Sequence, residues 1–246
     1  MHTVSQELAD RIRRPIPPDC SVVPRSLAVV AQGNPNTARV ATLTVNPSKL
    51  EFTTPKGTWL EPEYRRVESL RALDAEEAAT LTDEQVAATV DRSYGYFAGN
   101  PHRPGFAALQ ELLTGIGAGS YYDATACHLY LVQWATNPVW SGLTAAVREQ
   151  LVAADAEFLR WQLGTAAVQR VLVNGAAARE WVLRAGLVAA FDVDEVEYRN
   201  AKGRPKTMAL SHAEVDGVRW QGWATPAEDA LSTQGRARRM EWLRAQ

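Results

Sequence analysis

Short apolar runs bounded by turn residues recur along the chain and predict the strands of a buried sheet. The runs that are apolar, β-branched and of strand-like length are 38–45, 126–134, 169–173, 188–199, 207–212 and 217–223. Segments with helical periodicity are found at 5–13, 61–73, 83–97, 104–116, 143–153, 155–163, 176–184 and 235–245. Because strands that alternate with helices form mainly parallel sheets covered on both faces, the pattern predicts an α/β fold.

The first 36 residues have a different character from the rest. A short amphipathic helix pattern passes into Arg14-Pro-Ile-Pro-Pro18, which is expected to be extended because successive prolines forbid a helix. We interpret residues 1–36 as an arm packed on the domain. The sequence has no internal repeat and no linker-like stretch, so residues 37–246 are predicted to form a single domain.

Composition narrows the class of protein. Hydrophobic residues make up 46% of the 246 residues and charged residues 22%, which is typical of a compact soluble domain. No apolar run approaches the roughly 18 residues of a membrane span. Glu7 and Asp10 interrupt the region in which a signal peptide needs an apolar stretch. The expectation is a cytoplasmic monomer with no membrane partner.

Charge and metal-binding residues exclude further classes. The formal net charge is −2, so a nucleic-acid partner would have to be held by a local basic patch. Cys20 and Cys127 form no C-x-x-C pair, and the four histidines show no metal-ligand spacing. We therefore expect no metal and no other cofactor.

The ends of the predicted strands are the first places to look for chemistry. Ligands of open parallel sheets bind outside the carboxyl ends of the strands. This rule selects Asn46-Pro-Ser48, residues 133–140, Asn174-Gly175, and the loop 230–235 before the last helix.

Several of these segments resemble a known family. Val45-Asn-Pro-Ser48, at the end of a predicted buried strand, resembles the G-[ILM]-N-P-G motif of the uracil-DNA glycosylase superfamily. Residues 129–136 and Val171-Leu-Val-Asn-Gly175 resemble the second and third strands of its mismatch-specific members, and the loop 231–235 stands where their second active-site motif lies. The resemblance extends over residues 38–243. It implies a three-layer αβα fold with a central, mainly parallel four-stranded sheet, and a DNA glycosylase that needs no cofactor.

The resemblance assigns roles to residues of the first motif. Asn46 would hold a water in line with C1′ of the sugar, and Ser48 stands where the family usually has glycine. An extruded base needs an aromatic surface to stack on. Trp59 has the spacing of the family's stacking phenylalanine, and Phe52 is the second candidate. The alternatives are a strand-end Asn that satisfies its own turn and aromatic residues that merely pack in the core.

The position that reads the base edge departs from the family pattern. Tyr130 aligns with a residue that is often Asn in relatives, and a phenol lacks the paired donor and acceptor with which a carboxamide holds uracil. The expected substrate is therefore uracil or a modified pyrimidine, including a bulky cytosine derivative of the kind that phages carry. Asn174, after the third strand, is a further base-binding candidate.

The loop before the last helix departs as well. Many relatives have His-Pro-Ser there, whereas this chain has Leu231-Ser-Thr-Gln-Gly235, so the leaving base would depend on backbone N–H groups or on Ser232, Thr233 or Gln234. Leu231 would be the apolar wedge that fills the emptied base stack. The alternative is a polar helix cap. A set of cations that could contact DNA phosphates follows or precedes this loop, at Arg236, Arg238, Arg239, Arg244, Arg199, Lys202, Arg204 and Lys206.

Two secondary candidates and two rival functions complete the expectation. His128 is expected to be a strand-end hydrogen-bonding residue, and Glu51 is the carboxylate nearest in sequence that could assist the water. The hypothesis is a monofunctional glycosylase that leaves an abasic site, in repair or in defence against phage. The rivals are a catalytically idle DNA-binding protein of the same fold and a hydrolase of free nucleosides.

Overall fold

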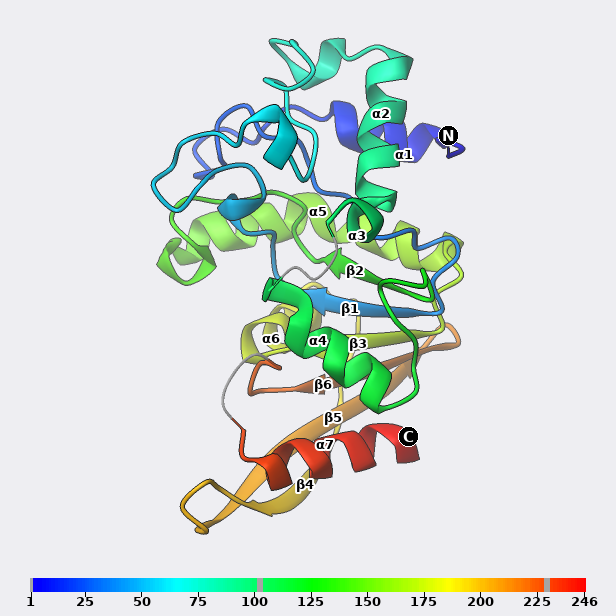
Figure 1. Cartoon of the computed structure of the whole chain (residues 1–246), viewed down its shortest axis with the longest axis vertical. Helices are drawn as coiled ribbons and strands as arrows, with labels where there is room; N and C mark the ends of the chain where they lie inside the picture. The colour runs from blue at the N-terminus through cyan, green and yellow to red at the C-terminus, as the bar shows by residue number, and fades with distance from the viewer. Residues whose placement is uncertain (1, 101–103, 228–230) are drawn as a thin grey trace.

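A mixed six-stranded sheet forms the centre of the molecule. The computed structural model describes residues 2–100, 104–227 and 231–246 (Figure 1). The strand order across the sheet is β2-β1-β3-β6-β5-β4. The strands are β1 (Val40–Thr44), β2 (Ala126–Tyr130), β3 (Arg170–Asn174), β4 (Asp192–Arg199), β5 (Pro205–Val215) and β6 (Val218–Trp223).

Five of the strands run in the same direction, and β5 runs opposite to them. β1 pairs in parallel with both β2 and β3, and β3 pairs in parallel with β6. β5 is antiparallel to β6 and to β4. The predicted α/β fold is confirmed. The sheet is mixed, with three parallel and two antiparallel pairings, and the prediction of four strands is wrong. The β4–β5 hairpin pairs with the free side of β6 and enlarges the sheet to six strands.

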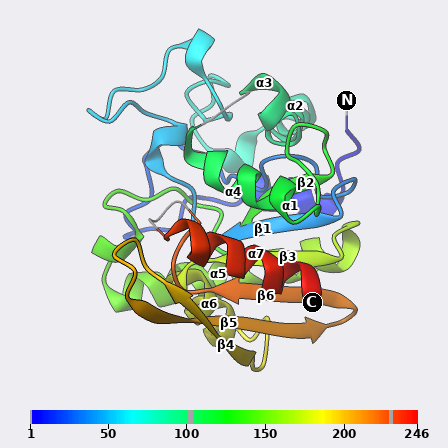
Figure 2. The same ribbon diagram turned by 60° about the horizontal axis from the view of Figure 1, so that its bottom comes forward.

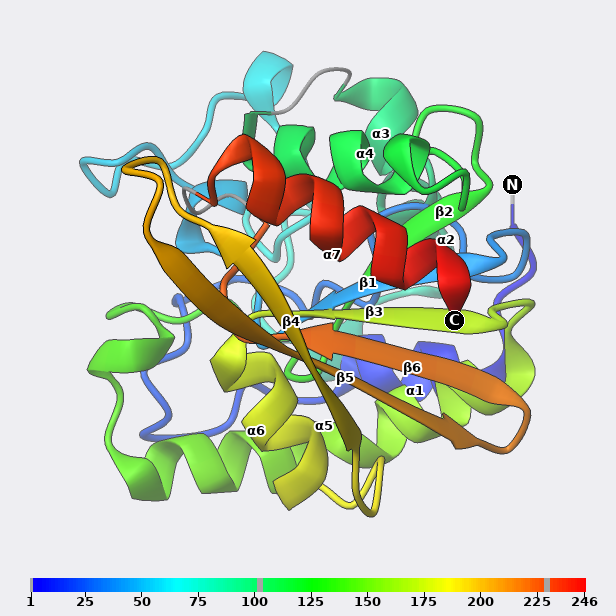
Figure 3. The same ribbon diagram turned by 90° about the horizontal axis from the view of Figure 1, so that it is seen from below.

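Helices lie on both faces of this sheet. The helices are α1 (Gln6–Arg13), α2 (Asp83–Tyr94), α3 (Tyr96–Gly99), α4 (Pro104–Gly115), α5 (Ala145–Thr165), α6 (Ala176–Arg184) and α7 (Thr233–Ala245). α4 and α7 lie side by side on one face, and α1, α5 and α6 lie on the other (Figures 2 and 3). Both faces of β1 and β2 are buried, as expected for parallel strands between helices.

Two helix predictions are wrong. Residues 61–73 form no α-helix, and only Pro62–Tyr64 makes a short 3-10 turn. The rest of that segment is drawn into the fold by local pairing, with Ser69 bridged to Ser26. The predicted break between residues 153 and 155 is absent from α5, because Asp155 turns its side chain into the core instead of capping a new helix.

The buried partner of Asp155 is Arg11, from the other end of the chain. Arg11 Nη2 donates to Asp155 Oδ2 at 2.8 Å, and Arg11 Nε donates to Gln133 Oε1 at 2.9 Å. The backbone N–H of Gln133 also donates to Asp155 Oδ2. Burial lowers the pKa of Arg11 to about 10, so it remains charged at neutral pH. This network ties α1 to α5 and to the segment after β2.

The N-terminal residues run along β2 and its continuation. The backbone N–H groups of Val23 and Val29 donate to the carbonyls of Ala135 and Gln133. Gln32 and His128 exchange both of their backbone hydrogen bonds, at 2.9 and 2.8 Å. Residues 27–32 are buried throughout. The division of the chain into an arm and one domain stays a prediction.

Candidate active site

A cavity opens at the carboxyl ends of β1, β2 and β3. Its volume is about 520 Å³. A separate groove of about 630 Å³ lies between α5 and α6. In the groove between the two helices, the cation Arg184 pairs with Glu149 and Glu180. The strand-end cavity instead gathers four of the predicted site residues, Asn46, Ser48, Tyr130 and Asn174.

Asn46 lies just beyond β1, with its carboxamide held from one side. Its Nδ2 donates to the carbonyl of Trp134 and to Oγ1 of Thr136, each at 3.1 Å. Because a backbone carbonyl can only accept, this contact fixes which end of the amide is nitrogen. Oδ1 makes no hydrogen bond within the described ranges. In the half-buried wall of a cavity, such an oxygen is suited to accept a hydrogen bond from a water.

His128 forms part of the cavity wall and is neutral. Its Nδ1 lies 2.6 Å from Thr42 Oγ1 and its Nε2 lies 3.0 Å from Thr44 Oγ1. Complete burial lowers the pKa of His128 to about 3. Thr42 Oγ1 also contacts the hydroxyl of Tyr121, so a chain of hydrogen bonds leads from the core to Thr44 at the cavity. His128 is thus a hydrogen-bonding residue of the strand, in line with the expectation.

Tyr130 closes the cavity beside His128. Its hydroxyl donates to Oε1 of Gln32 at 2.6 Å, and its ring meets the imidazole of His128 edge-on, with centroids 4.6 Å apart. Gln32 is fully buried, so the N-terminal segment holds the phenol in position. The polar tip of Tyr130 therefore acts as a fixed part of the wall.

A buried carboxylate and an aromatic ring complete the lining. Glu51 is 5% exposed, and its Oε2 accepts a hydrogen bond of 2.7 Å from the hydroxyl of Tyr96. Phe106, from the first turn of α4, stands 5.1 Å from His128 between ring centroids. Sequence reasoning missed Phe106, because an apolar residue in a helix carries no sign that its helix crosses the mouth of a neighbouring strand.

Asn174 is oriented by the loop that follows β6. Its Oδ1 accepts hydrogen bonds from Trp223 Nε1 at 2.9 Å and from the backbone N–H of Ala227 at 2.8 Å. The next residue, Gly175, has a φ of 96°, a conformation that favours glycine and that turns the chain sharply into α6. The side chain of Asn174 is therefore fixed where β3 ends.

Ser48 lies at the rim of the cavity. Its side chain is exposed, and its Oγ accepts from the backbone N–H of Leu50 at 3.2 Å, capping the short 3-10 helix Lys49–Glu51. Ser48 also forms a parallel bridge with Thr136, one of the partners of Asn46. It therefore helps to hold together the two segments that carry and support Asn46.

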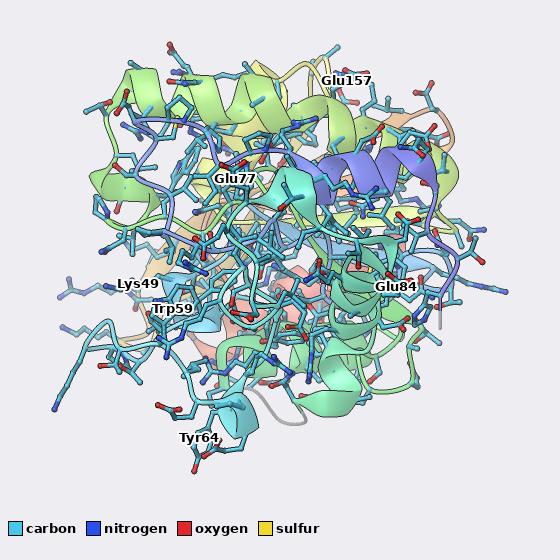
Figure 4. All side chains as sticks on the ribbon, turned by 90° about the horizontal axis from the view of Figure 1, so that it is seen from above. Lys49, Trp59, Tyr64, Glu77, Glu84 and Glu157 are labelled. Carbon is cyan, nitrogen blue, oxygen red and sulfur yellow. The ribbon has the colours of Figure 1, made fainter. Side chains whose placement is uncertain are left out.

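The predicted stacking residues Phe52 and Trp59 lie elsewhere. They line a neighbouring cavity of about 230 Å³, and Glu51 belongs to the walls of both cavities. Phe52 is buried and meets Trp59 edge-on, with ring centroids 6.1 Å apart. Trp59 lies on the same side of the molecule as Lys49 and Tyr64 (Figure 4). Phe106 and Tyr130 line the cavity together with Asn46, whereas Phe52 and Trp59 do not, so the geometry gives no support to a base stacked on Phe52 or Trp59.

The loop before α7 is folded onto the hairpin. Leu231 is 8% exposed, which leaves no apolar surface for a wedge in this conformation. Ser232 Oγ accepts from the N–H of Gly235 and donates to the carbonyl of Arg199. Gln234 Oε1 accepts from the N–H of Arg199 at 2.7 Å. Ser232 and Gln234 thus fit the alternative of a polar helix cap.

The cations of α7 differ in what they contact. Arg239 is 3% exposed, lies 5.1 Å from the ring centroid of Trp223 and donates to the carbonyl of Thr225, so it cannot reach a phosphate. Arg238 is exposed and pairs with Glu241 at 3.1 Å. Arg236 is exposed and donates to the carbonyl of Leu231, and Thr233 is exposed as well. Of these residues, Arg236, Arg238 and Thr233 are exposed enough to contact a DNA phosphate.

Other observations bear on metals, thiols and membranes. Within residues 2–100, 104–227 and 231–246, no group of three or more His, Cys, Asp or Glu residues could hold a metal ion. Cys20 and Cys127 are buried free thiols, and burial raises the pKa of each. None of the described helices combines the length and the apolar character that a membrane crossing requires.

No protein-family model matches this chain, and no curated protein matches it. Any functional conclusion therefore depends on the residues and the geometry around the strand-end cavity.

Proposed function

We propose that this protein is a DNA glycosylase that extrudes a pyrimidine nucleotide and hydrolyses its N-glycosidic bond. The observation that carries the proposal is the carboxamide of Asn46, held through Nδ2 with Oδ1 unpartnered in the described structure. It lies at the carboxyl end of β1, beside a cavity of about 520 Å³. The resemblance of Val45-Asn-Pro-Ser48 to the uracil-DNA glycosylase motif points to the same residue.

The proposed reaction does not require a strong general acid or general base from the protein. The oxygen of the attacking water bonds to C1′ while the bond from C1′ to the base nitrogen breaks, and the electron pair leaves with the base. The water then loses a proton, the departing base anion takes one up through solvent, and an abasic sugar and the neutral base remain. Asn46 Oδ1 orients the water, and the carboxylate of Glu51 in the cavity wall favours the positive charge that develops on the sugar.

The leaving base is held by uncharged groups. His128 is neutral because burial lowers its pKa to about 3, so it offers no cation to the departing anion. The fixed carboxamide of Asn174 and the phenol of Tyr130 are the polar groups of the wall that would read the base edge. Phe106 supplies the aromatic contact. This set of groups is compatible with uracil and with a modified cytosine in phage DNA.

The proposed partner is DNA, bound by a monomer without a cofactor. Base release from a panel of oligonucleotides tests the proposal. The panel carries uracil, hypoxanthine, thymine mismatches, 5-hydroxymethylcytosine and its glucosylated form, in duplexes and in single strands, and alkaline cleavage reports each abasic site. Release of uracil indicates a repair enzyme, and release of only the bulky cytosine indicates a role against phage.

The same panel separates the rival functions. Duplex binding without release of any base would replace the proposal with a DNA-binding protein that recognises modified bases without cutting. Hydrolysis of free nucleosides, with no action on DNA, would replace it with a nucleoside hydrolase.

A further inference from the structure

The β4–β5 hairpin extends past the edge of the sheet at which the candidate site lies. Leu210 of β5 pairs with Trp223, the last residue of β6, and Asp194 of β4 pairs with Leu210. Trp223 in turn pairs with Asn174 of the cavity wall. Residues 205–209 of β5 and 195–199 of β4 therefore lie beyond the row of strand ends. At about 3.3 Å per residue, this overhang is about 17 Å long.

The hairpin projects on the same side as the cavity. In Figure 1 the arrow of β1 points to the left, and the turn between β4 and β5 extends to the left at the lower end of the molecule. The loop after β1 extends to the left at the upper end. Figure 3 shows the hairpin turn on that same left side, next to the start of α7. DNA that presents a nucleotide to the cavity would therefore pass alongside the hairpin.

Charge is separated along the hairpin. Its outer part, residues 199–206, is here called the hairpin tip; it contains Arg199, Lys202, Arg204 and Lys206 and no acidic residue. The acidic residues Glu195 and Glu197 lie nearer the sheet on β4. A surface that serves only solubility intersperses both signs of charge. Here the cations are gathered at the outermost part of the overhang, and Glu195 and Glu197 lie within the overhang closer to the sheet.

Three of these cations have no neutralising partner among the residues that the structure describes. The side chains of Lys202, Arg204 and Lys206 are exposed and take part in no hydrogen bond or ion pair within the described ranges. Within the described ranges some exposed arginines are paired, as Arg238 is with Glu241, and others, such as Arg39 and Arg219, are not. The tip therefore carries a local positive field on a protein whose net charge is −2.

The backbone of the hairpin tip is held in one shape. Asn200 Oδ1 accepts from the N–H groups of Lys202 and Arg204, at 2.9 and 3.1 Å, and Arg199 Nη1 donates to the carbonyl of Gly203. At the base of the tip, the contacts of Ser232 and Gln234 with Arg199 fasten it to α7. Pre-organisation of this kind lowers the entropy lost when a surface binds a partner.

We infer that the hairpin tip binds the phosphate backbone of duplex DNA next to the cavity. The inference rests on the proposed function only in placing a nucleotide at the cavity. The phosphates of one DNA strand are spaced by about 3.4 Å of rise along the helix axis, so an overhang of about 17 Å corresponds to roughly five base-pair steps along that axis. A two-stranded ribbon also has dimensions that a DNA major groove admits. Lys202 and Arg204 provide sequence-independent contacts that release counterions on binding.

The salt dependence of binding tests the inference. We would measure the affinity of the full chain for an unmodified fluorescent duplex by anisotropy at several salt concentrations. The double variant K202Q/R204Q should weaken binding by about tenfold at low salt and reduce the magnitude of the negative slope of log K against log salt by about 2. The matched control R39Q/R219Q also removes two exposed cations, but at the amino edge of the sheet, and should change the affinity less than twofold.

Three outcomes separate this inference from the proposed function. Equal effects of the two double variants, once circular dichroism has shown that both are folded, would overturn the role of the hairpin tip. Weaker binding in K202Q/R204Q but not in R39Q/R219Q supports DNA binding by the hairpin tip. This holds even if no base is ever released and the glycosylase proposal is wrong. Base release by the wild type, together with unchanged duplex affinity in K202Q/R204Q, would refute DNA binding by the hairpin tip and leave the proposed function supported.

Discussion

Two regions were expected to build the active site: the ends of β1 and β3, and the loop that leads into α7. They differ in whether their residues line the cavity. At the strand ends, Asn46 and Asn174 line one cavity together with Tyr130. In the loop, Leu231 is buried and Ser232 caps a helix. Residues at the ends of parallel strands meet because sheet register brings them together. The contacts of a loop residue depend instead on the element against which the loop packs.

The element that decides the contacts of the loop is the hairpin. β5 pairs with β6, and Ala224, Thr225 and Leu231, which lie between β6 and α7 in the sequence, line one cavity with residues of β5. Gly235 of α7 lies so close to Tyr198 that an added Cβ would stand 2.9 Å from its ring. The start of α7 is thereby fastened to the hairpin, and its polar residues serve that contact.

The largest effect is expected when Asn46 is replaced, because this variant tests whether the strand-end cavity is the active site. Asn46→Ala should lower the rate of base release by at least about 100-fold, because the water loses the group that orients it. Duplex affinity should stay within about twofold, since no phosphate contact is changed. Single-turnover base release measures the first effect and anisotropy the second. Asn36→Ala, an exposed asparagine outside the cavity, is the control, and equal activity of the two variants would contradict the assignment.

The titration of His128 tests the strand-end region through stability. The folded-state pKa of about 3 lies below the ordinary value of 6.5, so between these values the unfolded chain binds one proton more. The stabilisation from neutral His128 is complete above pH 6.5 and is lost as the pH falls toward 3. The slope is about 1.4 kcal/mol per pH unit.

Urea unfolding of the wild type and of His128→Gln at pH 7, 6, 5 and 4 measures this difference. The free energy of unfolding of the wild type should fall more steeply with decreasing pH than that of the variant. An NMR titration of the imidazole that gave a midpoint near 6.5 in the folded protein would refute the prediction.

Arg239 tests the other region. Arg239→Met keeps much of the side-chain volume but removes the contact with Trp223 and the hydrogen bond to Thr225, and should lower the free energy of unfolding by about 2 kcal/mol. Arg238→Met, at an exposed position of the same helix, should change it by less than about 0.5 kcal/mol. If Arg239 instead contacted DNA, its replacement would weaken duplex binding more than that of Arg238.

The smallest expected effect is at the helix cap. Ser232→Ala removes the side chain that accepts from Gly235 and should cost about 1 kcal/mol of stability, measured by thermal unfolding. Thr233→Ala, next to it and exposed, should leave the melting temperature nearly unchanged. A loss of base release in Ser232→Ala without a loss of stability would return Ser232 to a catalytic role.

Most of the parallel sheet was predictable, because apolar β-branched runs between turn residues have few alternatives. The runs at 38–45, 126–134 and 169–173 contain β1, β2 and β3. The helix expected at 61–73 failed because periodicity alone does not report that Val67 and its neighbours are buried against the N-terminal segment. Each of the six strands had its own sequence pattern, but the six-stranded sheet was not predicted. The local sequence of a strand does not determine which strand it pairs with.

The candidate site was predictable where strand ends define it and unpredictable where distant elements contribute. Asn46, Tyr130 and Asn174 follow or end buried strands, and such positions converge in any parallel sheet. Phe106 reaches the cavity through the placement of α4, which depends on tertiary packing. Trp59 matched a sequence spacing, but the chain between it and Asn46 turns into a separate cavity.

The N-terminal segment that runs beside β2 has a consequence for self-association. A strand at the border of a sheet presents unpaired donors and acceptors that can template pairing with another chain. Here Val23, Val29 and Gln32 occupy positions along β2 and its continuation, whereas β4, at the opposite border, carries alternating charged residues. The two edges of the sheet are thus protected from intermolecular pairing in different ways. A chain shortened past Gln32 would expose the edge of β2 and become prone to aggregate.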